Sequence, residues 1–348
     1  MLVPKIPLVL AIGSMYRSKC ALSILVLLIG CWDLAIADDV HIYLLGGQSN
    51  GTGRGDAAEI QDDTLSQPQR DAKFWYRKTQ NSATNNALPE NELIDLAPGS
   101  GHGVVGVVMP VEFGPEISIG RELADSLPGQ NIMLIKGTRA GSNLHTHWAQ
   151  DGLHYNNFLQ TIGEAIAQIQ ANGDQPVFKG MFWVQGEADA NDLDNALDYE
   201  ANLTDLIRRV RDDLFDGRNA PFVLSQISDN QYASLGSGQL AVRAGQASVA
   251  ATDARTIMVA TDDDELFTTR ADIIHFDGDG LINLGRMMGQ AMVNLETLGD
   301  VNCDGVVNLL DVEPFINLIT SGQYGVKADI NQDGTVDLLD VAPFIELF

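Results

Sequence analysis

The sequence is short of cysteine and of basic residues, and each shortage excludes a class of protein. Only three cysteines occur in 348 residues, and Cys20 and Cys31 lie in an N-terminal leader. Cys303 is then the only cysteine of the mature chain, so no intrachain disulfide is predicted. The 21 Lys and Arg residues face 47 Asp and Glu, for a formal net charge of −26. This balance argues against nucleic acid as a partner, because phosphates require clustered basic side chains.

The sequence also lacks a hydrophobic run that would cross a membrane. The apolar run Ala21–Ile29 is too short to span a bilayer, so no membrane span is predicted. Arg17 and Lys19 precede this run, and Ala35-Ile36-Ala37 follows it with small residues at the spacing of a cleavage site. This order is typical of a secretory signal peptide, which we assign to residues 1–37.

A second export signal overlaps the first. Leu28-Ile29-Gly30-Cys31 resembles a bacterial lipobox, in which Cys31 would carry a lipid anchor. We therefore expect a bacterial protein that is secreted or held at the cell surface, and we favour simple secretion. Met1 and Met15 both remain candidate start sites.

From Asp39 onward, apolar strands alternate with amphipathic helices. Strands are expected at residues 40–45, 131–136, 179–184, 222–227 and 256–260, and the clearest helix at 193–214. Alternation of this kind predicts a three-layer α/β/α domain with a mostly parallel sheet over residues 39–298. Ligands of such folds bind beyond the carboxyl ends of the strands. Residues 51–112 are polar and are expected to form long loops, either over the active face or as a surface insertion.

After Leu298 a different pattern begins, an internal repeat over residues 299–348. Asp300–Asp311 recurs as Asp329–Asp340, and each copy is followed by Pro-Phe-Ile. Oxygen-bearing side chains stand at loop positions 1, 3, 5, 9 and 12, with glycine at position 6, which is the arrangement that calcium loops use. The sequence therefore predicts two Ca²⁺ sites.

The predicted ligands follow from these positions. In the first loop they are Asp300, Asn302, Asp304, Asn308 and Asp311 with the carbonyl of Val306; in the second they are Asp329, Asn331, Asp333, Asp337 and Asp340 with the carbonyl of Thr335. The second loop has four carboxylates against three, so we expect it to bind calcium more tightly. Pro314 and Pro343 are expected to interrupt or restart the helices that leave the loops.

The repeat resembles a type I dockerin, a small α-helical module of paired calcium loops. Position 12 is Asp, as in dockerins, rather than the Glu of EF-hands. The resemblance implies folding upon calcium binding and a cohesin-like protein partner. The positions where such a partner would bind carry Leu309-Leu310 and Leu338-Leu339.

Candidate catalytic residues lie at the two ends of the larger domain. Gly46-Gly47-Gln48-Ser49-Asn50 closes the first strand and would expose Ser49 on a tight turn at the edge of the sheet. Asp272 and His275 precede the last helix, expected to begin near Asp279. A separation of three residues allows the carboxylate to hold Nδ1 of the imidazole, leaving Nε2 free to take the serine proton. This combination predicts a serine hydrolase.

Four blocks together resemble the SGNH hydrolase superfamily, and within it the sialic-acid-esterase-like group also called carbohydrate esterase family 6. They are Gly46–Asn50, Ala140–Leu144 with Trp148, Gln185–Asp189, and Asp272 with His275. Phe113-Gly114-Pro115-Glu116 also resembles this group.

The resemblance implies a role for each matching residue. Ser49 would be the nucleophile, His275 the general base and Asp272 the residue that orients it. The oxyanion hole would combine the N–H groups of Ser49 and Gly141 with the side-chain amide of Gln185. Glu187, Asn143 and Trp148 would support the site or line the substrate pocket.

We therefore expect a carbohydrate acetylesterase that hydrolyses O-acetyl esters of acetylxylan or sialate type, with no cofactor for catalysis. Two alternatives remain. One is a non-catalytic, secreted carbohydrate-binding or attachment protein on an esterase scaffold, and the other is a lipid-directed lipase or thioesterase.

Overall fold

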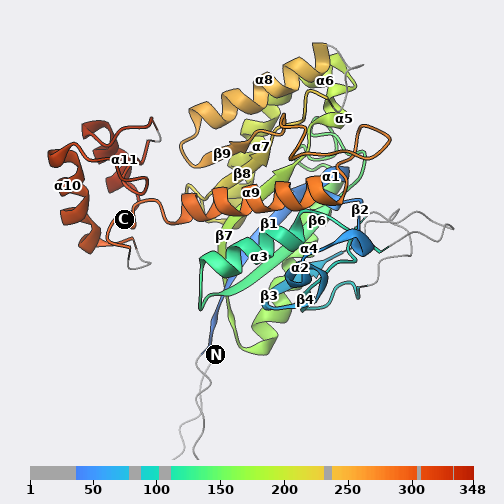
Figure 1. The fold of residues 1–348 in the computed structure, drawn as a ribbon, viewed down its shortest axis with the longest axis horizontal. Helices are drawn as coiled ribbons and strands as arrows, with labels where there is room; N and C mark the ends of the chain where they lie inside the picture. The colour runs from blue at the N-terminus through green and yellow to red at the C-terminus, as the bar shows by residue number, and fades with distance from the viewer. Residues whose placement is uncertain (1–36, 78–87, 102–110, 231–236, 304–306, 332) are drawn as a thin grey trace, which may run out of the picture. The chain divides into compact units, whose positions relative to one another are not determined.

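A computed structural model describes residues 37–77, 88–101, 111–230, 237–303, 307–331 and 333–348 (Figure 1). The predictions for the leader, including lipidation of Cys31, fall almost entirely outside these residues. The predicted ligands Asp304 and Val306 also fall outside them. Within the part of the chain that the structure describes, no helix is long and apolar enough to cross a bilayer.

The larger domain is built on a seven-stranded sheet in the order β4-β3-β6-β1-β7-β8-β9. Its strands are β1 (Asp39–Gly47), β3 (Gln69–Tyr76), β4 (Ile94–Leu96), β6 (Asn131–Thr138), β7 (Gln175–Val184), β8 (Phe222–Ser225) and β9 (Thr256–Val259). Strand β4 pairs antiparallel with β3, and the other neighbours pair in parallel. A second, two-stranded sheet joins β2 (Gly55–Asp56) to β5 (Glu112–Phe113). The predicted fold class, mostly parallel α/β, is confirmed.

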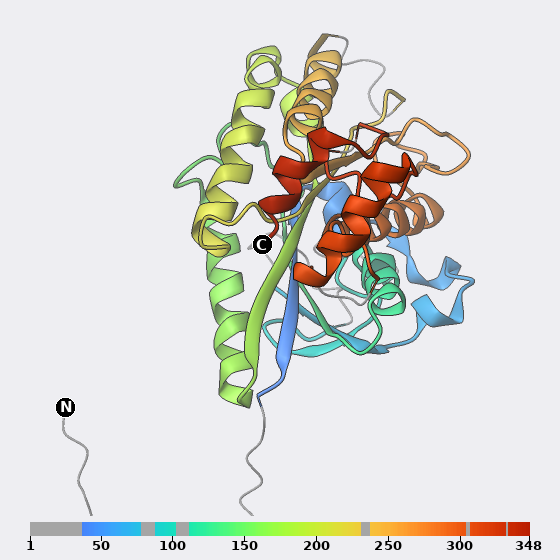
Figure 2. The same cartoon turned by 90° about the vertical axis from the view of Figure 1, so that its left-hand side faces the viewer.

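Helices cover both faces of the large sheet (Figures 1 and 2). The longer ones are α3 (Glu116–Ser126), α4 (Leu153–Asn172), α7 (Tyr199–Leu214), α8 (Ser237–Thr252) and α9 (Gly278–Glu296); α1 (Ser49–Thr52), α2 (Asp63–Ser66), α5 (Glu187–Ala190) and α6 (Leu193–Leu197) are short. Ile42 and Leu44 of β1 pack on the face covered by α4, α7 and α8. Tyr43 and Leu45 pack on the opposite face, with α3 and α9. Alternate residues of the central strand thus enter two separate cores.

Two details of the sequence prediction were wrong. Residues 51–112 do not form loops throughout, because β3 and β4 lie within them and extend the sheet. Exposed Arg70, Asp71 and Lys73 give β3 a polar sequence, although Phe74 is fully buried. The helix expected at 193–214 divides at Asp198 into α6 and α7.

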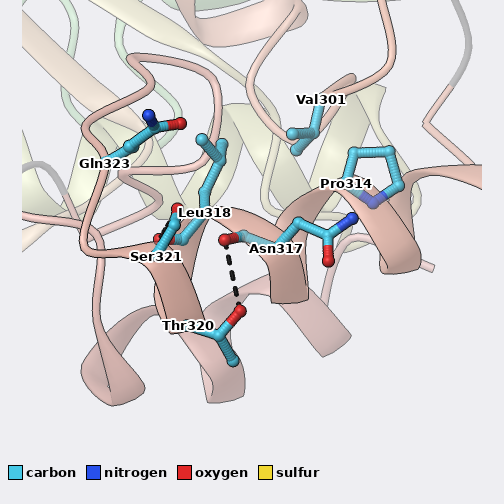
Figure 3. A pocket seen from close by; sticks show the side chains of 7 residues that line it. All are labelled: Val301, Pro314, Asn317, Leu318, Thr320, Ser321 and Gln323. Atoms are coloured by element: carbon cyan, nitrogen blue, oxygen red, sulfur yellow. Dashed lines mark hydrogen bonds between the residues drawn. The ribbon is translucent and has the colours of Figure 1, made fainter.

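The C-terminal module consists of two similar helical units. They are η2 (Leu309–Asp311) with α10 (Val312–Ser321), and η3 (Leu338–Asp340) with α11 (Val341–Ile345). Pro314 and Pro343 lie in the first turns of α10 and α11, where a missing N–H costs little, so each helix restarts just before its proline. Phe315 and Phe344 stack at 3.9 Å between ring centroids. They form the centre of a small core that also includes Leu298, which the sequence analysis assigned to the preceding domain. An open hollow beside α10 is lined by Leu318 and its neighbours (Figure 3).

Candidate active site

Ser49 stands at the start of α1, immediately after the central strand. Gly47 has φ +132°, and a Cβ there would lie 2.1 Å from the carbonyl oxygen of Val184. Only glycine allows this approach, through which the N–H of Gln48 donates to that carbonyl at 2.8 Å. The chain therefore turns sharply away from the sheet, and Ser49, 6% exposed, lies at the carboxyl end of β1.

Asp272 and His275 form the pair that their spacing predicted. His275 Nδ1 lies 2.9 Å from Asp272 Oδ2. The other carboxylate oxygen, Oδ1, accepts the backbone N–H groups of Ile274 at 3.0 Å and His275 at 2.9 Å. Both oxygens of Asp272 thus hold the segment that carries the imidazole, and Nε2 is the nitrogen left for proton transfer.

The environment sets the charge of both groups. Partial burial alone would raise the pKa of Asp272, but hydrogen bonds from the His275 ring and from two backbone N–H groups outweigh it and lower the pKa to about 2. Burial lowers the pKa of His275 from its ordinary value of 6.5, against the opposing effect of Asp272. At neutral pH the pair is a carboxylate beside a neutral imidazole, which is the state that a general base requires.

Asn50 connects the serine turn to the histidine loop. Its Oδ1 accepts the N–H of Phe276 at 3.1 Å, and its Nδ2 donates to the carbonyl of Ile274 at 3.3 Å. These two residues flank His275. The structure therefore brings Ser49 and His275, 226 positions apart in sequence, to the same edge of the sheet.

The predicted oxyanion donors differ in whether they already make hydrogen bonds. Within the described residues, no hydrogen bond uses the N–H of Ser49 or of Gly141, and Gly141 is exposed with φ +70°. The Gln185 side chain is 1% exposed. Its Nε2 already lies at hydrogen-bond distance from Gln48 Oε1 (3.1 Å), the Ser142 carbonyl (3.2 Å) and Asp189 Oδ2 (2.5 Å). An amide nitrogen has two hydrogens, so in this arrangement the Gln185 donor is occupied.

The three other predicted site residues act as supports here. Glu187 is 3% exposed and accepts from Asn50 Nδ2 at 2.6 Å. Asn143 Oδ1 accepts the N–H groups of Thr146 and His147, which closes the loop after Gly141. Trp148 is 1% exposed, so it does not line an open pocket; its Nε1 donates to Ser142 Oγ at 2.9 Å.

A buried ion pair next to the helical turn that Ser49 begins was not predicted. Lys136 Nζ lies 2.9 Å from Glu116 Oε2 and donates to the carbonyl of Thr52, the last residue of α1, at 2.7 Å. Both side chains are at most 3% exposed. The available signal in the sequence was a lysine at the end of an apolar strand, because a buried lysine requires a partner of opposite charge.

Two further charged groups, Arg54 and Glu112, lie near the carboxylate of Asp272. Arg54 Nη1 lies 3.7 Å from Asp272 Oδ2, and Arg54 Nε lies 4.0 Å from Glu112 Oε1. Burial raises the pKa of Glu112 to about 7, although Arg54 and Arg270 oppose this. Nothing in the local sequence of either residue indicated this placement.

In the C-terminal loops, the carboxylates at position 12 accept hydrogen bonds from the backbone of their own loop. Asp340 Oδ1 and Oδ2 accept the N–H groups of Asn331 and Asp337, and Asp311 makes the equivalent bonds with Asn302 and Asn308. Gly334, at position 6 of the second loop, has φ +88°. Among the described residues, no group of three or more His, Cys, Asp or Glu has the geometry of a metal centre. The donor set is all oxygen and fits a hard cation such as Ca²⁺ in its chemistry.

With this geometry, the comparisons identify the class of protein. Residues 39–294 match the family described as carbohydrate esterase, sialic acid-specific acetylesterase, and residues 298–346 match the dockerin type I domain. The first match covers more than half of the chain, which therefore belongs to this carbohydrate esterase family. The protein is thus a carboxylic ester hydrolase with a C-terminal dockerin type I domain, as its motifs predicted.

Solved structures share the fold of the catalytic domain. A protein from Arabidopsis thaliana has 20% identity and a TM-score of 0.54, over 73% of this chain and 97% of that one. NanS has 18% identity and a TM-score of 0.54, over 74% of this chain and 98% of that one. A carbohydrate acetylesterase from Xanthomonas citri has 19% identity and a TM-score of 0.50, over 73% of this chain and 55% of that one. No curated protein gives a significant match.

Proposed function

We propose that the protein is an exported serine acetylesterase that removes O-acetyl groups from carbohydrate. Ser49 attacks the acyl carbon while His275 takes its proton, and Asp272 stabilises the imidazolium that forms. The alcohol of the sugar leaves with that proton, and water then releases acetate from the acyl-enzyme through the same base. His275 carries every proton transfer in this scheme, and Asp272 stabilises the charge that His275 acquires.

The N–H groups of Ser49 and Gly141 are the proposed oxyanion donors because they make no other hydrogen bond within the described residues. Such a donor contributes roughly 3 kcal/mol to the stability of the transition state. Gln185 is the proposed third donor, and it can serve only if one of its present acceptors is exchanged for the oxyanion. Asp189, at 2.5 Å, is its closest acceptor.

The observation that carries the proposal is the oriented Asp272–His275 pair, held beside the serine turn by Asn50. The test is acetate release from p-nitrophenyl acetate and from acetylated xylan, for the wild-type protein and for Ser49→Ala. The expected result is turnover in the wild type and loss of about three orders of magnitude or more in the variant. A folded wild-type protein without turnover on any ester would favour the carbohydrate-binding alternative.

The acyl and sugar groups are separate questions. The family description and the acetylesterase from Xanthomonas citri favour acetyl esters of carbohydrate. Comparing acetyl, butyryl and octanoyl p-nitrophenyl esters tests this, since a preference for the long chain would indicate a lipase or thioesterase. O-acetylated sialic acid and acetylated xylan, assayed side by side, then distinguish the two carbohydrate substrates.

For the C-terminal module we propose two calcium ions held by the predicted loop ligands. Bound calcium would supply the positive charge that gathers the loop carboxylates, and its binding energy would contribute to folding. In the first loop, Lys327 Nζ contacts Asp300 Oδ2 at 2.8 Å, whereas position 1 of the second loop, Asp329, has no lysine contact within the described residues. This contact and the count of carboxylates both favour tighter binding in the second loop.

The module is also the proposed attachment site for a cohesin-like partner, which would hold the esterase outside the cell. Leu309, Leu310, Leu338 and Leu339 are 66–78% exposed, at equivalent positions of the two repeats. Exposed leucine pairs suit an apolar partner surface better than a polar one. Calorimetry with a type I cohesin domain tests this. Because the two repeats present equivalent leucine pairs, Leu338→Ser with Leu339→Ser should weaken binding only when Leu309 and Leu310 are also replaced by serine.

A further inference from the structure

The buried carboxylate of Glu187 has no direct part in acyl transfer, and its position raises the question of what it does. It lies at the start of α5, after β7, and is 3% exposed. Oε1 accepts from Asn50 Nδ2 at 2.6 Å, while Oε2 has no hydrogen-bond partner within the described residues. Burying a carboxylate costs free energy unless hydrogen bonds or an opposite charge compensate for the lost hydration, and Asn50 supplies the one side-chain hydrogen bond to it among the residues that the structure describes.

Asn50 uses all of its hydrogen-bonding groups to join three separate segments. Its Nδ2 donates both to Glu187 Oε1 and to the carbonyl of Ile274, and its Oδ1 accepts from the N–H of Phe276. Asn50 is itself 1% exposed and follows the nucleophile directly in the chain. Its backbone thus belongs to the serine turn, while its side chain holds the backbone on both sides of the general base.

The loop that carries His275 needs such support. Ile273 has φ +53°, in the left-handed region that a β-branched residue rarely adopts. A conformation of this kind persists only where the surroundings determine it more than once. Asp272 Oδ1 holds the loop from within, through the N–H groups of Ile274 and His275. From outside, the side chain of Asn50 holds the peptide groups at Ile274 and Phe276.

We propose that Asn50 and Glu187 form a positioning clamp, in which Glu187 fixes the Asn50 amide so that it holds the His275 loop at a set distance from Ser49. Asn50 and Glu187 are positioning residues that do not touch the substrate. The clamp rests on the proposed function of Ser49 and His275. The role of the clamp follows from its contacts. Asn50 follows Ser49 in the chain, and its side chain bonds to Ile274 and Phe276 on either side of His275.

Glu187 helps to fix the orientation of the Asn50 amide, because its Oε1 accepts a hydrogen bond from Asn50 Nδ2. If the amide rotated by 180°, its oxygen would face Glu187 Oε1 and the Ile274 carbonyl, and its nitrogen would face the N–H of Phe276. Three attractive contacts would then become repulsive. A carboxylate accepts but does not donate when ionised, so Glu187 selects the orientation with Nδ2 toward it. Burial raises the pKa of Glu187, while hydrogen bonds from its own N–H and from Asn50 oppose this. An acceptor oxygen at this position is required in either protonation state.

Asn50→Ala tests the clamp. We expect kcat to fall by about 10²-fold with little change in KM, because the base is misplaced while the substrate contacts remain. Asn283→Ala is the matched control, since it removes an asparagine bond to a backbone carbonyl, that of Leu266, without contacting residues 274–276. This control should retain wild-type kcat within about twofold.

A polarity swap tests the proposed mechanism. Asn50→Asp places a second carboxylate against Glu187 and the Ile274 carbonyl, so we expect a loss at least as large as that of Asn50→Ala. Adding Glu187→Gln restores a donor opposite the new carboxylate, and should recover about tenfold in kcat. Glu187→Gln alone keeps an acceptor oxygen for Asn50 and should stay within about threefold of the wild type. A double variant no more active than Asn50→Asp would overturn the clamp, even if Asn50→Ala failed to fold.

Hydrogen–deuterium exchange provides a readout that does not depend on turnover. The N–H of Phe276 should exchange faster in Asn50→Ala than in the wild type, and at the wild-type rate in Asn283→Ala. Unchanged exchange together with unchanged kcat would refute the clamp while leaving the esterase proposal intact. Wild-type protein without esterase activity, but with faster exchange at Phe276 in Asn50→Ala, would refute the proposed function and leave the structural clamp standing.

Discussion

The catalytic domain and the C-terminal module obtain their order in different ways. The catalytic domain buries two extensive apolar clusters, one on each face of a seven-stranded sheet. The module's cluster contains six buried apolar side chains among the described residues. A core of that size contributes little net stability, which is why small domains commonly depend on metals or disulfides. With Cys303 the only cysteine there, calcium is the stabiliser that the module's own residues suit.

The difference in core size suits the two regions to different functions, catalysis in the large domain and attachment in the module. Acyl transfer needs groups held to within fractions of an ångström, and the large domain places them at the ends of buried strands with polar supports underneath. The module instead exposes leucine pairs. The attachment proposed for them would tolerate a fold that forms only with calcium. Spectroscopy can separate the two, because all four tryptophans precede residue 184, whereas Tyr324 is the tyrosine of the module.

After Ser49→Ala, the largest effect expected on catalysis is that of Asp272→Asn. The amide cannot stabilise the imidazolium and favours the wrong tautomer of His275, so kcat/KM should fall by about 10⁴-fold. Steady-state kinetics on p-nitrophenyl acetate measure this. Calcium binding by the module should be unchanged. A loss below about tenfold would contradict the assignment of Asp272.

A large effect on stability is expected from Glu116→Ala. It leaves the Lys136 ammonium buried without its partner, at a cost of about 3–5 kcal/mol. Burial already lowers the pKa of Lys136, and Glu116 is the group that opposes this. Urea unfolding followed by tryptophan fluorescence reports this domain. Replacing both residues, as Glu116→Leu with Lys136→Met, should restore part of the loss, and equal destabilisation of the single and double variants would argue against the ion pair.

A moderate effect is expected from pH. His275 must be neutral to accept the serine proton, and burial lowers its pKa from 6.5. Activity is therefore fully present above that lowered pKa and is lost about tenfold per unit as the pH falls below it. Asp272, with a pKa of about 2, stays ionised throughout. The acid midpoint of kcat/KM should lie below 6.5, and a midpoint above 6.5 would show that another group controls the rate.

The smallest effect on catalysis is expected from removing calcium. Chelation should abolish the module's helical circular dichroism signal and alter Tyr324 fluorescence, while kcat/KM stays within about twofold. Asp340→Ala, at position 12 of the second loop, should reproduce the change in the module at limiting calcium. Parallel loss of esterase activity on chelation would mean that the two regions are coupled.

Much of the site was predictable because its signals are local. The Asp272–His275 pair is separated by three residues, and Ser49 follows a glycine pair that ends an apolar strand. The connection between these two segments was not predictable, since Asn50 meets Phe276 only when β1 and the start of α9 are brought together. The third predicted oxyanion donor illustrates the same limit. A motif identifies Gln185, but only packing shows that its amide is already engaged by Asp189 and two other acceptors.

The sequence by itself determined the alternation of strands and helices, and it predicted the candidate catalytic residues and the two candidate calcium loops. These depend on periodicity, on turn glycines and on ligands spaced within a dozen residues. The tertiary structure alone decided that β3 extends the sheet, that Lys136 and Glu116 pair beneath the nucleophile, and that Asn50 and Glu187 meet the histidine loop. The side-chain contacts among them join residues from 20 to 226 positions apart. Their free energy comes from desolvation and geometry, which no local pattern encodes.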